Sequence, residues 1–300
     1  MSLESKTATL PPRIDLRSLE KNVYEWRSLK NTLLTGLIWF LGIVASIPLF
    51  SVIFMLIVEG GTRLDIEALT ALPPAGFEMG GGFGNAILGT LTMVGIAAAI
   101  SIPIGVLAAI YLGVLNPKSQ LATTSRFLAK VLTGFPSILA GVFVYAVLVV
   151  TMGTYSAWAG GVALAVLMLP TVILAAEEAM KQVPQRMKDA AFGMGCTRTQ
   201  VIFKVVLPTG LPGILTGVIL AVAGAAGESA PLLFTALFSN YYMAELAEPT
   251  ASLSILIYNF SGMPFENQIE LAWAASLVLV MLVLFFNILA RIIGRSKFRE

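Results

Sequence analysis

Residues 181–208 read KQVPQRMKDAAFGMGCTRTQVIFKVVLP and form the most basic connection between two strongly apolar runs of the chain. Short loops rich in Lys and Arg stay on the cytoplasmic side of a membrane. The flanking runs, 157–179 and 211–238, are each long enough to cross a bilayer as a helix. The stretch therefore predicts an integral membrane protein in which this loop faces the cytoplasm.

The rest of the chain fits the same arrangement. With 57% hydrophobic residues and a mean hydropathy of +0.86, its 300 residues are too apolar for a soluble domain. The expected spans are 33–58, 85–115, 127–152, 157–179, 211–238 and 271–293. Among the 19 Lys and Arg residues, only Arg63 then falls on the outer side. We therefore expect an all-α protein with six transmembrane helices and both termini in the cytoplasm.

Composition excludes several functions. The sequence has no histidine and a single cysteine, so zinc chemistry through imidazole and an internal disulfide are ruled out. No G-x-x-x-x-G-K-[ST] motif occurs, so the chain has no P-loop with which to bind and hydrolyse a nucleotide. The net charge of +2 gives no indication of a nucleic-acid partner.

These observations divide the chain into segments. We expect a cytoplasmic tail at 1–32, a first transmembrane helix at 33–58 and an external loop at 59–84. A transmembrane domain at 85–293 and a second cytoplasmic tail at 294–300 follow. Within the first tail, residues 14–30 have the spacing of an amphipathic helix lying on the membrane surface, or form an ordinary tail. The outer region 239–270 carries four Glu and no basic residue, and is either a partner contact or a solvated connector with a short helix.

The basic loop, which we delimit as 181–209, is expected to fold rather than to act as a spacer. Asp189 is a good residue for a helix start, because a carboxylate there meets free backbone N–H groups. Gly193 and Gly195 interrupt that helix, and a second helical stretch ends at Leu207-Pro208. Two short helices joined at a glycine form a rigid projection, suited to a groove on another protein.

The residues of this loop resemble the E-A-A–x3–G–x9–I–x–L-P signature of ATP-binding cassette importer permeases. The matching positions are Asp189, Ala190, Ala191, Gly195, Val205, Leu207 and Pro208, of which Asp189 and Val205 are conservative departures. The resemblance implies the type-1 (MetI-like) permease fold and a coupling helix that docks on a cytoplasmic ATPase. It also implies that ATP and Mg²⁺ are held by that partner, and that this chain carries no cofactor.

A second resemblance is to the A-type permease subunits of phosphate importers. It rests on GESAPLLFTA at 227–236, on Glu177-Glu178 with Val183-Pro184, and on GFPS at 134–137. This resemblance implies a multi-pass protein of the bacterial plasma (inner) membrane that forms half of a phosphate pathway. Its partners would be a sister permease subunit of the C type, two copies of the ATPase subunit, an external phosphate-binding protein and membrane lipid.

Glu228 lies in or at the end of an apolar run, and such carboxylates usually face a water-filled path or a partner. The alternative is a hydrated position at the outer interface. The residues expected along the pathway are Glu228, Ser229, Pro231, Ser137 and Thr133. Glu228 could accept a hydrogen bond from a protonated phosphate oxygen or pair with an Arg of the sister subunit. The permeases that the chain resembles often carry an Arg where it has Gly224, and since this chain then offers no cation at that depth, we expect the second role.

The sequence bears on three alternative functions. A permease for another oxyanion, such as molybdate, sulfate or phosphonate, would keep the basic loop but not the segment 227–236. A self-sufficient ion-coupled transporter or channel would need intramembrane cation sites, inverted repeats or a filter loop, none of which is recognisable here. A scaffold without transport activity would leave Glu228 and the folded loop unexplained.

Overall fold

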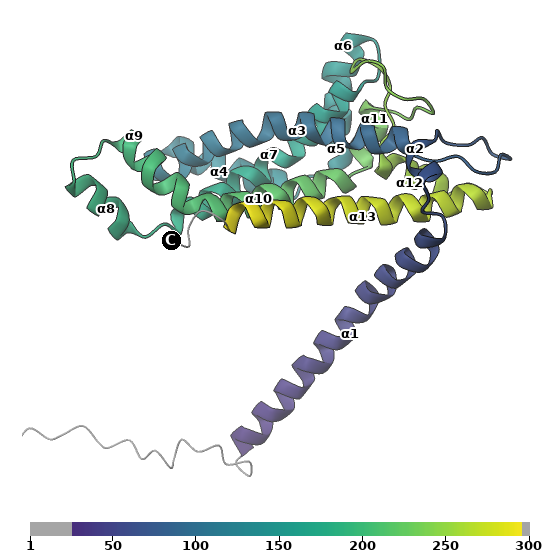
Figure 1. Cartoon of the computed structure of the whole chain (residues 1–300). Helices are drawn as coiled ribbons and strands as arrows, with labels where there is room; N and C mark the ends of the chain where they lie inside the picture. Colours follow the sequence, from purple (N-terminus) through teal and green to yellow (C-terminus); the bar gives the residue numbers. More distant parts are fainter. Residues whose placement is uncertain (1–25, 296–300) are drawn as a thin grey trace, which may run out of the picture. The chain divides into compact units, whose positions relative to one another are not determined.

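The computed structural model describes residues 26–295, which contain helices and no strand (Figure 1). The predicted amphipathic helix at 14–30 lies mostly outside the described residues. Its last five residues, from Trp26, belong to the first helix, α1 (Trp26–Thr62), which begins earlier and ends later than the expected span 33–58.

The chain divides into two units, residues 1–54 and 55–300, and the boundary falls inside α1. In the second unit the last turns of α1 are packed. Leu56 is buried, and a Cβ added at Gly60 would lie 2.7 Å from the carbonyl oxygen of Trp273. Gly60 thus lets the end of α1 approach the backbone of the C-terminal helix closely.

The remaining elements follow in chain order, all in the second unit. The transmembrane bundle and its connections comprise α2 (Ile66–Thr70), α3 (Gly84–Ile110), η2 (Tyr111–Leu115), α4 (Gln120–Thr133), α5 (Ser137–Val144), η3 (Tyr145–Val149), α6 (Val150–Met152), α7 (Ala157–Lys181), α8 (Gln185–Gly193), α9 (Arg198–Val201), η4 (Ile202–Val206), α10 (Leu207–Gly227), α11 (Ala230–Thr235), α12 (Leu253–Ser261) and α13 (Glu266–Arg295). The η elements are π-helical turns, each continuous with the helix before it.

Five helical stretches within residues 26–295 are long and apolar enough to span a membrane. They are Trp26–Thr62, Gly84–Leu115, Ala157–Lys181, Arg198–Gly227 and Glu266–Leu289. A sixth span is obtained if the pair Gln120–Thr133 and Ser137–Met152 is counted as one, although these two helices are bent by 105°. The spans agree with the expected membrane architecture.

The apolar run 127–152, expected as one spanning helix, is not a single uninterrupted helix. Helix α4 ends at Thr133, and α5 begins at Ser137 after Pro136, whose φ of −58° and ψ of 122° are not helical. A proline disfavours helical geometry in the residue before it and lacks the N–H needed within a helix. The sequence Gly134-Phe135-Pro136 therefore breaks the apolar run in its middle.

The core of the second unit lies where α3, α7 and α10 pack together. Helix α7 contacts both of the others, and α13 packs along α10. Buried side chains such as Met93, Leu164 and Met168 fill the interface. Helices α8 and α9 lie at one end of this bundle, and α2 and α12 lie toward the other (Figure 1).

The segment 239–270 contains the short helix expected under the second alternative, α12, but this helix is largely buried rather than solvated. Leu253 and Leu256 of α12 are fully buried against α3 and α13, and Ile255 is fully buried in the core formed with α3, α7 and α10. The amide of Leu253 donates to Oγ1 of Thr90, 2.8 Å away. Composition alone could not reveal this, because the four Glu residues fall outside α12 while α12 itself is apolar.

Glycines on α3 differ in what surrounds them. A Cβ added at Gly89 would overlap the carbonyl oxygen of Ala251, whereas one added at Gly95 would have no atom within 4 Å. Gly89 therefore permits a close backbone approach between α3 and the start of α12, and Gly95 does not serve this contact.

We predict that Gly89→Ala lowers the free energy of unfolding by about 1–3 kcal/mol, because the added methyl group forces backbone apart in a packed region. Gly95→Ala is the matched control on the same helix, and it should leave stability unchanged or slightly raised, since Ala is the better helix former. Thermal unfolding in detergent measures both. Equal stability of the two variants would contradict the packing seen at Gly89.

Candidate functional site

The basic loop folds into α8, a turn and α9, as expected, but its first helix starts earlier than predicted. Pro184 precedes the first helical residue, Gln185, so Asp189 lies in the interior of α8. Nε2 of Gln185 donates to Oδ1 of Asp189, 2.9 Å away and one turn along the helix. The prediction of Asp189 at the helix start is wrong, because Pro184, with its fixed φ, already begins the turn.

The turn between the two helices confirms the role of glycine at this point. Gly195 has a φ of +82°, a left-handed conformation that residues with a side chain adopt only with strain. Thr197 then caps α9 in a capping box, in which its hydroxyl accepts from the amide of Gln200 and the Gln200 side chain accepts from the amide of Thr197. The loop is thus a defined helix–turn–helix projection.

The second helix does not stop at Leu207-Pro208, contrary to the prediction. It runs without a break from Arg198 through the π-helical turn η4 into α10, and ends at Gly227. Pro208 lies just after η4, in the first turn of α10. A π-helical turn changes the hydrogen-bonding register, so the proline that lacks an N–H is accommodated without ending the helix.

The signature residues of the loop separate into a surface group and an anchored group. Asp189, Ala190 and Gly195 are exposed. Ala191, Val205 and Leu207 are partly buried and pack on an apolar cluster, which we call the coupling-end core. Its buried members are Ala109, Ile110, Ala176, Ala179, Met180, Val183, Val201, Ile202, Val206 and Ile214. The projection is therefore fixed to α3, α7 and α10 by apolar burial.

The outer surface of the projection combines apolar and basic side chains. Met194 is 84% exposed, and Met187 and Phe192 are a little under half exposed. Arg186 and Arg198 are exposed on the same segment. Exposed large apolar side chains next to charged ones are typical of protein–protein contact surfaces.

A second feature lies where α10 ends. The helix stops at Gly227, and Glu228 continues in an extended conformation. A cavity of about 210 Å³ adjoins this end and is lined by Leu132, Thr133, Phe135, Ser137, Leu167, Met168, Thr171, Leu220, Ala221, Gly224, Ala225 and Glu228. The structure thus brings together Thr133, Ser137 and Glu228, three of the five predicted pathway residues.

The other two predicted pathway residues do not line this cavity. Ser229 is the residue before α11, and Pro231 is buried in the first turn of that helix. A Cβ added at Gly141 would lie 2.6 Å from Cα of Pro231, so the proline packs against α5. Helix α10 ends at Gly227, and the carbonyl oxygen of the next residue, Glu228, accepts from Oγ of Ser254, 2.9 Å away.

The polar groups of the cavity are one carboxylate and three hydroxyls. Glu228 supplies the carboxylate, and Thr133, Ser137 and Thr171 supply the hydroxyls. None of the described lining residues is Lys or Arg, and a Cβ added at Gly224 would have no atom within 4 Å. The cavity can exchange hydrogen bonds with a polar solute, but a compensating cation has to come from outside this lining.

The sequence reasoning missed one charged cluster. Glu177 is buried and forms ion pairs with Arg126 and Lys181. The spacing of Glu177 and Lys181, four residues apart, was a visible signal for a pair on one helix face. Arg126, 51 residues away, carried no such signal. Within residues 26–295, acidic, Cys or His side chains do not gather in threes as a metal site.

Residues 101–299 match the family described as binding-protein-dependent transport system inner membrane component. The phosphate transport system permease protein PstA of Yersinia pestis is 37% identical over 281 residues, which cover 91% of this chain and 92% of that protein. The protein of the same name from Haemophilus influenzae is 38% identical over 274 residues, covering 91% and 97% of the two chains. A probable PstA of Methanocaldococcus jannaschii is 38% identical and covers 86% of this chain and 91% of its own length.

Solved structures share the fold. A chain of a bacterial alginate ABC transporter, in complex with its alginate-bound periplasmic protein, superposes with a TM-score of 0.66 at 15% identity and covers 93% of this chain and 99% of its own. A chain of the MetNI methionine ABC transporter in an inward-facing conformation gives a TM-score of 0.60 at 22% identity, with 72% and 96% covered. This chain therefore belongs to the binding-protein-dependent transport system inner membrane components, and among them to the family of the PstA phosphate transport system permeases.

Proposed function

We propose that this chain is one of two permease subunits of an ATP-driven phosphate importer and forms half of its translocation pathway. The relatives that cover nine tenths of it are phosphate transport system permeases, which favours phosphate over molybdate, sulfate or phosphonate. A sister permease of the C type, two ATPase subunits that hold ATP and Mg²⁺, and an external phosphate-binding protein would complete the complex. Both termini would face the cytoplasm, as the distribution of Lys and Arg indicates.

The proposed mechanism rests on one observation. A single continuous helix, Arg198–Gly227, runs from the exposed projection to the cavity at Glu228. At 1.5 Å per residue this helix is roughly 45 Å long, enough to cross the membrane. A helix transmits displacement along its axis, because shortening or bending it breaks backbone hydrogen bonds. Movement of the projection by an ATPase would therefore reach the cavity wall and switch the cavity between its two sides.

Glu228 has a defined role in this proposal. Its carboxylate repels an anion, and the lining of the cavity offers no compensating cation among the described residues. We propose that an Arg of the sister subunit pairs with Glu228, so that the two subunits complete the polar path together. Thr133, Ser137 and Thr171 would donate and accept hydrogen bonds along it.

We predict that Glu228→Gln in the assembled, reconstituted transporter lowers ATP-driven phosphate uptake at least tenfold, equivalent to about 1.4 kcal/mol of lost stabilisation of the rate-limiting step. Glu178→Gln is the matched control, because Glu178 is an exposed carboxylate outside the cavity. It should keep uptake within twofold of the wild type. Unchanged uptake in Glu228→Gln would remove this carboxylate from the pathway.

The contact between the projection and the ATPase can be tested by crosslinking. In a Cys196→Ser background, which removes the single native thiol, Ala190→Cys should crosslink to the ATPase subunit through a short thiol–amine reagent. Ser261→Cys, exposed at the end of α12, is the control and should give no such product. If Ala190→Cys crosslinks only to protein added on the external side, the projection faces outward and cannot contact a cytoplasmic ATPase.

The two loop glycines allow a comparison of backbone geometry at nearly the same place. Neither has an atom within 4 Å of an added Cβ, but only Gly195 has a positive φ. Gly195→Val should lower uptake at least tenfold because it reshapes the turn, whereas Gly193→Val should retain at least a third of it. Full uptake in assembled Gly195→Val would count against docking through this turn.

A further inference from the structure

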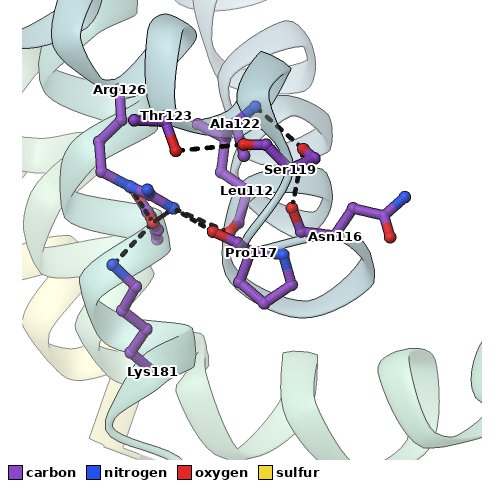
Figure 2. A network of polar contacts seen from close by, with 9 residues as sticks. Leu112, Asn116, Pro117, Ser119, Ala122, Thr123, Arg126 and Lys181 are labelled. Carbon is purple, nitrogen blue, oxygen red and sulfur yellow. Dashed lines mark hydrogen bonds and ion pairs between the residues drawn. The ribbon is translucent and has the colours of Figure 1, made fainter.

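Glu177 is the most buried charged side chain among the described residues, with a relative exposure of 2%. Its Oε1 accepts from Nε of Arg126 at 2.8 Å and lies 2.7 Å from Nη2 of Arg126 and 2.7 Å from Nζ of Lys181. Figure 2 shows Arg126 and Lys181 reaching toward one point from two helices. One carboxylate thus joins α4 to the end of α7.

Arg126 also holds a third element. Its Nη2 donates to the carbonyl oxygen of Leu112, 3.1 Å away in the π-helical turn η2 (Figure 2). In a π-helical turn a carbonyl accepts from the amide five residues on, and here the carbonyl of Tyr111 accepts from the amide of Asn116. For Leu112 the corresponding residue is Pro117, which has no N–H. The guanidinium supplies the missing donor and thereby fixes η2 to α4.

The approach of η2 to α7 is close at the same point. A Cβ added at Gly113 would lie 3.4 Å from Cγ of Glu177. Arg126 and Glu177 therefore clamp three elements together, and we call this set of contacts the α4–α7 clamp. Arg is suited to it, because its planar fork can serve a carboxylate and a carbonyl at once.

The clamp lies between the two functional regions. Lys181 is the last residue of α7, and α8 begins at Gln185. A cavity of about 300 Å³ next to the clamp is lined both by Gly113 and Pro117 and by residues of α8 and α9. On its other side, Thr133 and Thr171 of the pathway cavity lie on the same two helices as Arg126 and Glu177, about 10 Å and about 9 Å along their axes.

We propose that Glu177 and Arg126 are positioning residues of the transport cycle, which hold α4, η2 and α7 as one rigid wall between projection and cavity. The proposal rests on the proposed function, since it assigns them to the coupling of ATP hydrolysis to transport. With the wall intact, displacement of α8 moves Thr133 and Thr171 together. With the clamp open, α4 and α7 separate, and hydrolysis no longer drives the cavity.

The test measures two rates in the same proteoliposomes, which contain the whole transporter and the external binding protein. The quotient is the amount of phosphate imported per ATP hydrolysed. Loss of assembled transporter would lower both rates equally and leave this quotient unchanged, whereas loss of coupling lowers the quotient. Glu177→Gln and Arg126→Gln should each lower this quotient at least fivefold and keep ATP hydrolysis within twofold of the wild type.

Two further variants complete the test, Lys181→Met as the control and Arg126→Lys as a partial loss of the clamp. Lys181→Met should keep the quotient within twofold, because the Lys181 side chain is 42% exposed and Arg126 still pairs with Glu177. Arg126→Lys retains the positive charge but loses the fork that reaches Leu112, so its quotient should fall two- to threefold.

Each result decides one question. Absence of ATP-driven phosphate uptake by the wild-type complex would refute the proposed function itself. With uptake present, a wild-type quotient in both Glu177→Gln and Arg126→Gln would overturn the clamp. Should those two variants fail to assemble, a wild-type quotient in Arg126→Lys would overturn it instead, and a reduced quotient would support it.

Discussion

Away from water, every backbone N–H and C=O group has to find a hydrogen-bond partner within the protein, and this constraint governs the bundle. Within a long helix the backbone groups satisfy one another. Where a helix is interrupted, they need partners from other elements. At Glu228 the freed carbonyl is satisfied by Ser254 of α12. At Leu112 the partner is Arg126 of α4. Each interruption is therefore also a point at which distant elements are tied together.

These interruptions lie at the places to which we assign the proposed transport roles. The end of α10 exposes Glu228 to a cavity, and the bend before α5 sets Ser137 on the same cavity. The turn at Gly195 shapes the projection, while the coupling-end core fixes that projection to three long helices. Rigid helices with a few well-supported breaks can pass a movement from one site to another, which a loosely packed connection cannot do.

The sequence predicts the backbone conformation correctly where one residue alone determines it. It predicts the conformation wrongly where neighbouring residues also contribute. Gly195 was correctly identified as a turn, because a positive φ needs glycine. Asp189 and Pro208 were misjudged. Pro184 begins α8 earlier than the carboxylate suggested, and the π-helical turn η4 carries the helix past Pro208. Pro136 by itself indicates a helix break, but it lies within a continuous apolar run that predicts a single transmembrane helix.

The sequence by itself determined the membrane architecture, the folded basic loop and the family signatures, because hydropathy, charge and turn chemistry act over a few residues along the chain. Only the tertiary structure decided which polar groups meet. Arg126 reaches Glu177 across 51 residues, and Thr133, Thr171 and Glu228 gather on one cavity from three helices. Which polar side chains come into contact depends on how the helices pack and where they break. The packing energy is spread over many apolar contacts between distant residues, so a local sequence pattern does not reveal it.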